Sequence, residues 1–410
     1  MKKEQYRSTV IDTTLNIVNS QIESVRNKHI AKTSQRVYQD GFIGVAGALG
    51  SFIEADLLKE AQEALKKKID YPVIPSAKQT LAYDMRQPMM SAPDLIGEFS
   101  ALLEELRNRQ PNFIFSNKIS LTEVRANFTN DVDLNLDYTD RCLSAGLIFK
   151  EKKSASVFDG SLGFQERKYD QKLVLEEFDL ILNAYSEKVS LPKLGRYPII
   201  FFTEEAPTDK FISDLKADIF AQGGSLFSGK LGQQLFHGSF TFGQNLDPKT
   251  TYNTPFFDSE GVVNPGFVFN LIENGVLKAP YCDKKTAHKY GLFPTGSAFA
   301  PYDGVPQTAL LRPAIKNTGQ DLKSLLGGQM GILILMAGGG DFTPQGDYAT
   351  PVQLALLFDG DHLLGRLPEF NLSSNVYNMF GKGFRGATTN TFLPFSTGDF
   401  TVLEMNISET

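Results

Sequence analysis

The stretch Phe113-Ile-Phe-Ser-Asn-Lys-Ile-Ser-Leu121 has the two-residue period of a β-strand. A second stretch with the same period follows the polar pair Asn130-Asp131. The apolar residues at every second position are Phe113 and Phe115, Ile119 and Leu121, and then Leu134, Leu136 and Tyr138. Two such runs with a polar turn between them predict an antiparallel hairpin or meander from Phe113 to Lys150.

Apolar residues spaced three and four apart predict helices on both sides of this hairpin. The expected helices run from about Glu54 to Lys68, from just after Pro93, and from about Gln171 to Lys188. The second helix shows the spacing most clearly, with Leu95, Phe99, Leu102, Leu103 and Leu106. We therefore expect an amino-terminal α/β domain in which helices cover a sheet.

The composition changes beyond Gly223, where Gly, Phe, Pro and Thr become frequent. The pair Asn274-Gly275 stands between apolar runs and is typical of a tight hairpin. Other expected elements are strands at Tyr197 to Phe202, Leu235 to Phe242, Gly331 to Met336, Leu354 to Phe358 and Phe400 to Met405, and a short helix from Thr208 to Ala221. The predicted fold class is α+β, with the α/β domain over residues 1–192 and an antiparallel, barrel-like β-rich domain over residues 193–410.

The charge and the rare residue types limit the possible functions. The chain has 410 residues, a net charge of −6, four His and two Cys. Mild acidity gives no attraction to nucleic acid, and zinc and most transition-metal sites are built from His and Cys, which are scarce here. No stretch is long and apolar enough for a membrane-spanning helix, and Met1 to Arg7 is polar, so we expect no membrane partner and a cytoplasmic protein with free thiols.

Two local patterns are candidates for chemistry. Asp258 and Glu260, followed by Gly261, can put two carboxylates on one side of an extended segment, for acid-base work or a hard cation. The alternative is an exposed turn closed by the glycine. Gly338-Gly339-Gly340 follows an expected buried strand, where a phosphate loop would lie, but Pro344 opposes the helix that such a loop needs. A β-turn or a close backbone approach is the preferred interpretation there.

Several blocks of the second half resemble the TldD/PmbA family, labelled modulators of DNA gyrase and understood as zinc-dependent peptidases. They occur in the order that the family shows. The blocks are Gly223 to Gly232, Phe257 to Gly261, Leu271 to Lys278, Thr286 to Gly291, Pro294 to Ser297 and the Gly-rich stretch around Gly338 to Asp347. The amino-terminal half is similar to the family more loosely.

The resemblance implies two kinds of chain. The catalytic kind carries HExxxH on a helix, two zinc-binding histidines with a glutamate as general base, and a distant cysteine ligand. The corresponding stretch here is Gly229-Lys-Leu-Gly-Gln-Gln-Leu-Phe-His237, with one histidine and no glutamate, and no cysteine follows Cys282. The resemblance is therefore to the PmbA/TldE branch, which implies no zinc in this chain, zinc in a catalytic partner, and no catalysis by this chain alone.

The resemblance further implies a non-catalytic subunit that pairs with a TldD-like zinc-bearing chain, or with itself, and acts on extended, unfolded peptides. Two alternatives stay open: a stand-alone homodimeric binding or scaffold protein of the same fold, and an enzyme using an unrecognised site around Asp258 and Glu260. The candidate substrate or interface residues are Asp258, Glu260, Gly261, Thr295, Gly296, Gly338 and Gly339.

Overall fold

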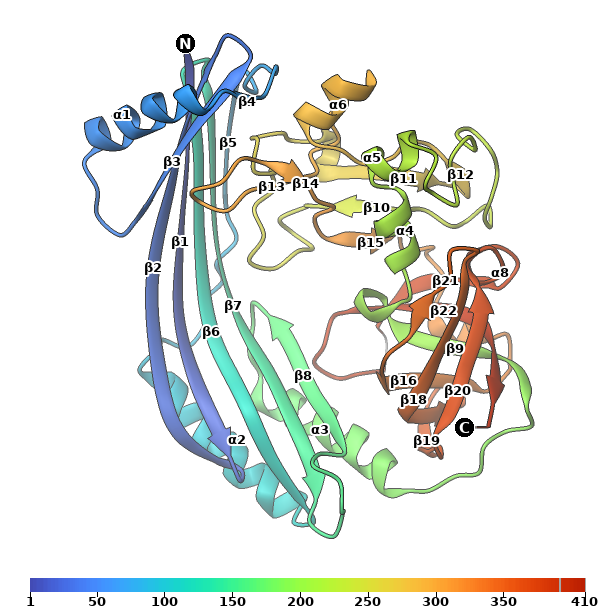
Figure 1. The fold of residues 1–410 in the computed structure, drawn as a ribbon. Coiled ribbons are helices and arrows are strands. Elements are labelled where there is room, and N and C mark those ends of the chain that lie inside the picture. The colour runs from blue at the N-terminus through green and yellow to red at the C-terminus, as the bar shows by residue number, and fades with distance from the viewer. Residues whose placement is uncertain (391, 410) are drawn as a thin grey trace.

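The amino-terminal half is built on one sheet of very long strands, with the order β4-β3-β2-β1-β6-β7-β5 and with β8 beside β7 (Figure 1). The computed structural model describes residues 1–390 and 392–409. The strands are β1 Lys2–Val18, β2 Gln21–Gln39, β3 Phe42–Leu49, β4 Ile69–Asp70, β5 Gln79–Asp84, β6 Phe113–Asn130, β7 Leu134–Glu151 and β8 Gly160–Glu166. Neighbouring strands are antiparallel except β5 and β7, which are parallel.

The predicted hairpin is confirmed as β6 and β7, in register from Phe113 opposite Glu151 to Thr129 opposite Asn135. The three predicted helices are confirmed as α1 Glu54–Ala64, extended by the 3₁₀ turn η1 Leu65–Lys67, α2 Asp94–Arg109 and α3 Gln171–Ser186. They lie against the sheet, as expected. The hairpin of β1 and β2 was not predicted.

The buried face of this sheet changes along its strands, and β2 is in addition exposed on both faces from Glu23 to Asn27. On β7, Leu136 and Tyr138 pack against Phe256 of the second half, whereas Leu147 packs against α2 and α3 from the opposite face. In β1 the same change places Glu4 and Leu15 on opposite faces, both buried. A strand that exchanges its buried face loses the simple two-residue period.

The carboxyl-terminal half contains a small sheet and a closed barrel. The small sheet has the order β12-β11-β10-β15, and in the barrel β16-β9-β22-β20-β18 the first and last strands pair. The barrel strands are β9 Gly195–Phe202, β16 Gly331–Ala337, β18 Asp347–Phe358, β20 Phe370–Asn375 and β22 Asp399–Ser408. The small-sheet strands are β10 Phe242–Asn245, β11 Val268–Glu273, β12 Val276–Leu277 and β15 Pro313–Ile315.

Shorter elements complete this half. They are η2 Thr203–Glu205, α4 Asp209–Asp214, α5 Ala217–Ala221, η3 Pro265–Phe267, α6 Lys284–Tyr290, β13 Ala298–Phe299, β14 Gln307–Thr308, α7 Leu322–Leu326, β17 Asp341–Phe342, β19 Leu363–Arg366, α8 Val376–Phe380 and β21 Phe384–Thr389. The predicted Asn274-Gly275 hairpin is confirmed by β11 and β12, and the predicted barrel-like sheet by the closed barrel.

Two predicted elements of this half were wrong. The helix expected from Thr208 to Ala221 is broken into α4 and α5, because Lys216 is extended and bridges to Tyr281. The strand expected from Leu235 to Phe242 is irregular except at its last residue. Its aromatic side chains bury in a cluster with Phe211 rather than along a pleated strand.

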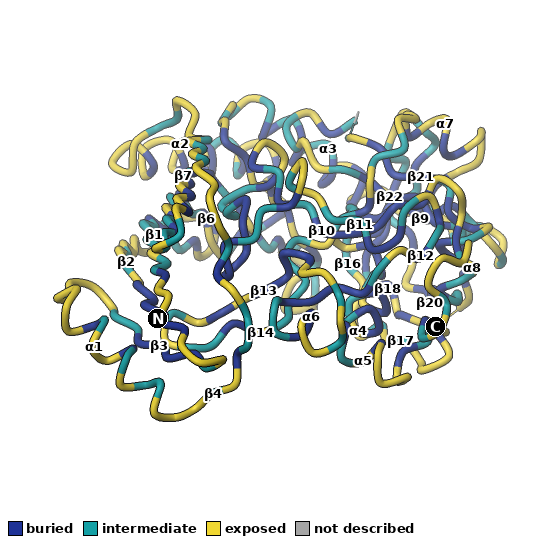
Figure 2. Tube along the Cα trace, turned by 90° about the horizontal axis from the view of Figure 1, so that it is seen from above, coloured by how far each residue is buried: buried dark blue, intermediate teal, exposed yellow. Residues whose placement is uncertain are grey.

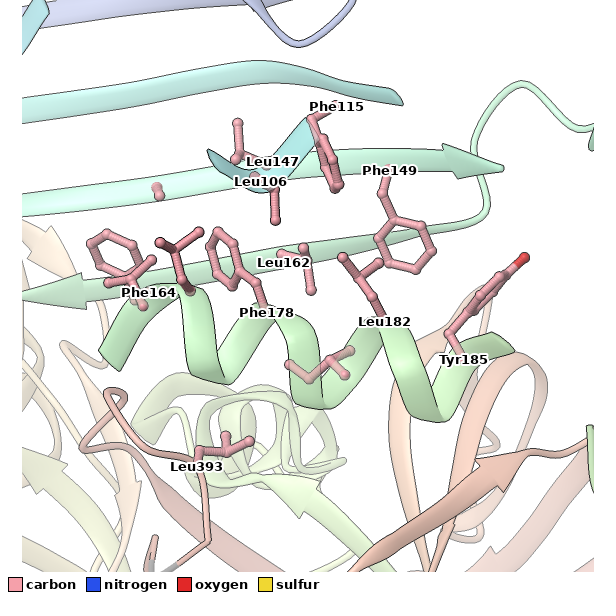
Figure 3. Close-up of a cluster of buried hydrophobic side chains, with 14 of the residues drawn as sticks. Leu106, Phe115, Leu147, Phe149, Leu162, Phe164, Phe178, Leu182, Tyr185 and Leu393 are labelled. Carbon is pink, nitrogen blue, oxygen red and sulfur yellow. The ribbon is translucent and has the colours of Figure 1, made fainter. Parts of the chain in front are cut away.

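One hydrophobic cluster joins the two halves of the chain. It includes Phe178 of α3 together with Ile200, Leu333 and Phe400 of the barrel. Figure 3 shows α3 lying between the strands that carry Leu147 and Leu162 and the carboxyl-terminal segment that carries Leu393. The division into domains at residues 192 and 193 stays a prediction.

Loops of the second half lie against the sheet as well. Figure 2, seen from above, shows β13 and β14 between the amino-terminal sheet and the carboxyl-terminal strands. Within the described ranges, the structure has no helix that is long and apolar enough to cross a membrane.

Candidate functional site

The turn from Asp258 to Gly261 is buried, with Asp258 2% and Glu260 1% exposed. One carboxylate oxygen of Asp258 accepts hydrogen bonds from the backbone N–H groups of Glu260 and Val262, each at 2.9 Å. The other accepts from the N–H of Ala298 at 3.1 Å. Gly261 has a φ of 67°. The segment is therefore a glycine-closed turn, as one interpretation had it, but it is not exposed.

The Glu260 carboxylate connects three segments. One oxygen accepts a hydrogen bond from the hydroxyl of Tyr71, and the other accepts from the backbone N–H of Lys284 at 2.8 Å. The ammonium of Lys284 donates to Ser76 Oγ at 2.8 Å and to the carbonyl oxygen of Glu260 at 3.1 Å. The turn is thus bonded both to the loop before β5 and to the start of α6.

The amino-terminal sheet supplies further buried polar groups to this turn. Glu4 on β1 accepts hydrogen bonds from the Tyr38 hydroxyl at 2.5 Å and from the Arg36 guanidinium at 3.2 Å. Arg36 also donates to the carbonyl oxygen of Ser259. We call the set Glu4, Arg36, Tyr38, Tyr71, Asp258, Glu260 and Lys284 the carboxylate cluster.

Burial raises the pKa of both turn carboxyls. The pKa of Asp258 rises to about 6 because desolvation outweighs the three backbone hydrogen bonds. The pKa of Glu260 rises to about 8, first by desolvation and then by the nearby charge of Asp258. The two groups are close enough to titrate as a pair. Glu260 can therefore hold a proton near neutral pH, as a general acid or base must, but it is closed off from solvent.

Thr295 and Gly296 lie beside the carboxylate cluster. The Thr295 hydroxyl donates to the carbonyl oxygen of Cys282 at 2.9 Å and accepts from its N–H at 2.8 Å. Gly296 has a φ of 67°, and an added Cβ would lie 2.7 Å from Asn264 Nδ2. Both residues hold the buried loop that leads to Ala298, so their contacts are structural.

Gly338 and Gly339 lie apart from the other candidates, in an exposed, irregular connection between β16 and β17, which both pair with β18. Gly339 has a φ of 77°, and the N–H of Gly338 donates to the carbonyl oxygen of Pro351 at 3.2 Å. No helix of phosphate-binding length follows, since β17 comes next. The described chain forms no hydrogen-bonded turn at these glycines, so the β-turn is wrong, whereas an added Cβ at Gly340 would lie 2.6 Å from the Tyr348 hydroxyl, which is a close backbone approach. Five of the seven candidate residues come together without Gly338 and Gly339.

The segment Gly229 to His237 folds as consecutive turns rather than as a helix. His237 is exposed, and its Nδ1 lies 2.8 Å from Ser239 Oγ. Cys282 is buried, with its Sγ 3.3 Å from the carbonyl oxygen of Phe293. Across residues 1–390 and 392–409, no group of three or more His, Cys, Asp or Glu side chains is arranged to hold a metal ion. These residues do not fit the zinc site that the resemblance describes.

The model of the PmbA/TldA metallopeptidase C-terminal domain matches residues 194–409, more than half of the chain. The chain belongs to the PmbA/TldD family. It is also 35% identical over 118 residues to a metalloprotease of Methanothermobacter thermautotrophicus. That match covers 27% of this chain and only 24% of the relative.

Solved structures share the fold of this PmbA/TldD family chain. TldE from Thermococcus kodakarensis superposes with a TM-score of 0.78 at 18% identity, over 99% of this chain and 96% of that one. A protein from Thermotoga maritima named as a modulator of DNA gyrase gives 0.78 at 15% identity, over 99% and 96%. One from Bacteroides thetaiotaomicron, similarly named, gives 0.75 at 15% identity, over 100% and 94%. At these identities the likeness concerns the fold.

Two surface clefts of this PmbA/TldD family chain were missed by the sequence analysis. The first, of about 520 Å³, lies on the barrel over a row of paired residues that runs across the sheet: Arg196, Asn406, Ser373, Ala349 and Asp341. The second, of about 440 Å³, lies on β1, β2 and β6 and is lined by Val10, Asp12, Thr14, Asn16, Arg26, Lys28, Ile30, Lys32, Lys118 and Ser120. In the sequence, both clefts correspond to polar residues at every second position of a strand. This pattern cannot be distinguished from that of an ordinary solvent-exposed sheet face.

Proposed function

We propose that this chain is a non-catalytic, TldE/PmbA-like subunit of a zinc metallopeptidase complex that acts on unfolded peptides. The segment Gly229 to His237 carries the proposal. Where the catalytic kind of chain has HExxxH, this segment has Gln233, Gln234 and one histidine, His237. A neutral amide cannot take up a proton as a general base, and a catalytic zinc needs three protein ligands.

Family membership supports the peptidase context, and the TldE-like fold supports the subunit role. The metalloprotease from Methanothermobacter is named for an activity that we assign to a zinc-bearing, TldD-like partner chain. In this proposal the present chain brings no metal of its own. A second copy of the same chain is the other partner to be tested.

A catalytic role for Asp258 and Glu260 has less support. Both side chains are almost fully buried, and neither lines either of the two clefts described above. Their hydrogen bonds go to the backbone and to Tyr71, which is the pattern of a structural connection. We also propose a cytoplasmic location, where the buried thiols of Cys142 and Cys282 stay reduced.

The test is to replace His237 by alanine in this chain and to mix the variant with an HExxxH-bearing relative. We expect the zinc content and the rate of cleavage of a fluorogenic unfolded peptide to stay within about twofold, because the His237 side chain is exposed and its contacts are with Ser239 and the Phe384 ring. The matched control replaces the first histidine of the relative's HExxxH, which should abolish both. Loss of zinc or of cleavage on His237→Ala would contradict the proposal.

A further inference from the structure

Part of β2 is an unpaired strand edge. Strand β3 pairs with β2 only from Lys32 to Gln39, and from Gln21 to Ile30 the outer edge of β2 has no strand beside it in the described chain. In Figure 1, β2 is the outer strand over this length. An unpaired edge with its N–H and C=O groups exposed is a template for an added strand.

The hydrogen-bonding groups of this edge can be assigned from the pairing. The N–H of Gly50 donates to the carbonyl oxygen of Ala31 at 2.9 Å, so Ala31 points toward the outer edge. The N–H and C=O of one residue point to the same side and alternate along a strand. The backbone groups of Val25, Asn27 and His29 are therefore presented outward, free for an incoming chain.

The adjoining sheet face is basic. Arg26, Lys28, Lys32 and Lys118 line the 440 Å³ cleft, against a single acidic residue, Asp12. Asp12 accepts hydrogen bonds from the hydroxyls of Thr14 and Thr122. None of the four basic side chains forms an ion pair with any described residue. This is an excess of positive charge on a chain of net charge −6.

We propose that the free edge of β2 binds an acidic peptide in extended conformation, which adds as a strand and places alternate carboxylates over Arg26 and Lys28. Main-chain hydrogen bonds give such a complex its affinity, and every second side chain gives it specificity. The surface lies apart from the carboxylate cluster. The inference goes beyond the proposed function, since binding by the isolated chain needs no zinc-bearing partner.

Charge distinguishes this occupant from two others. A second copy pairing through the same edge about a two-fold axis would bring basic residues opposite basic residues, which is unfavourable. A nucleic acid has no backbone amides to complete the edge and is repelled by the overall negative charge. An acidic peptide satisfies both the unpaired edge and the basic face.

The experiment measures binding of labelled ten-residue peptides to the isolated chain by fluorescence anisotropy. We expect a peptide of alternating Glu and Ser to bind more tightly than one with the same composition arranged Glu-Glu-Ser-Ser, and a Lys-Ser peptide not to bind. Two further peptides carry N-methyl groups on every second backbone amide, one on the odd-numbered and one on the even-numbered residues. Only one of these two sets of amides faces β2, so one methylated peptide should lose binding and the other should keep it. The proposal would be overturned if the two Glu peptides bound equally well and if the two methylated peptides also bound equally well.

Variants of the chain sharpen the test. Exchanging both Arg26 and Lys28 for glutamate should weaken binding of the alternating peptide about tenfold or more. The double variant Lys59→Glu with Lys66→Glu, at exposed positions of α1 and η1, makes the same change of net charge and should not weaken it. His29→Pro removes an outward N–H, and His29→Ala keeps it, so only the proline variant should lose the peptide. Circular dichroism and thermal melting show whether each variant is folded.

Three results would contradict the inference. The first is unchanged peptide binding in folded His29→Pro. The second is a ten-nucleotide single-stranded DNA that binds the same edge more tightly than the peptide. The third is a dimer, seen by sedimentation, that His29→Pro converts to monomer, because a second copy would then occupy the edge.

Discussion

The Glu260 side chain shows how a single residue can carry both structure and pH dependence. Its carboxylate is bonded to Tyr71 and to the start of α6, so it joins the two halves of the chain. Sequence reasoning selected Glu260 and Asp258 from their spacing but could not tell that the turn is buried. Burial depends on β1 and β2, which supply Glu4 and Arg36 and which the sequence analysis did not predict.

The raised pKa values predict how stability depends on pH. The pKa of Glu260 rises from an ordinary 4.5 to about 8, so the folded chain holds a proton that the unfolded chain releases. The contribution of this group is present below about pH 4.5 and is lost as pH rises through 8. Glu260→Gln keeps a neutral side chain, so urea unfolding midpoints should fall less between pH 5 and pH 8 than in the wild type. The prediction would be contradicted if the urea midpoint fell by the same amount between pH 5 and pH 8 in the wild type, in Glu260→Gln and in the exposed control Glu104→Gln.

The buried ion pair of Asp140 and Arg167 offers a second prediction for a single residue. The guanidinium contacts both carboxylate oxygens, at 2.7 and 2.8 Å, and also bonds to the carbonyl oxygens of Pro248 and Thr251. Arg167→Ala leaves the fully buried Asp140 without its partner, which should cost about 3–5 kcal/mol of unfolding free energy. Denaturant unfolding measures this cost.

The control for that variant is Arg109→Ala. Arg109 forms surface ion pairs with Glu105 of α2 at 2.8 Å and with Asp179 of α3 at 3.1 Å. Loss of a surface pair costs about 1 kcal/mol or less. If Arg167→Ala costs no more than this control, the buried pair does not hold the loop from Pro248 to Thr251 as described.

Among the elements, the buried turn at Gly261 packs closely against β7 of the amino-terminal sheet. An added Cβ would lie 2.7 Å from Leu134 Cδ2 on β7. Gly266 has a similar φ, 62° against 67°, but an added Cβ there meets no atom within 4 Å. The pair of glycines therefore separates the cost of backbone strain from the cost of a clash.

We expect Gly266→Ala to cost about 1–2 kcal/mol of unfolding free energy, from its left-handed backbone alone. Gly261→Ala should cost about 1–3 kcal/mol more, because the methyl group also overpacks the contact with β7. The measurement is urea unfolding of both variants. Equal losses would mean that the turn can move away from β7 without penalty.

The elements that the sequence analysis predicted are those in which buried residues recur at a regular spacing over many positions. α2 keeps Leu95, Phe99 and Leu106 on one side along its whole length, and β6 and β7 alternate cleanly on either side of the exchange of faces. In β2 the residues from Glu23 to Asn27 are exposed on both faces, so no apolar period exists to be read. The helix break at Lys216 comes from pairing with Tyr281, far away in the sequence.

For the whole molecule, family membership was predictable from ordered blocks of sequence, and the family model confirms it. The second-half barrel was predictable as a class, but its closure by β16 and β18 depends on long-range pairing. The two clefts were not predictable, because they form only when strands distant in sequence lie side by side.

The central claim is that this chain serves a peptidase without holding its zinc. The most direct measurement is metal analysis and cleavage of an unfolded peptide with this chain alone, with an HExxxH-bearing relative alone, and with the two mixed. We predict no stoichiometric zinc and no cleavage for this chain alone, and a stable complex with zinc-dependent cleavage for the mixture. Stoichiometric zinc and cleavage by the isolated chain would contradict the account.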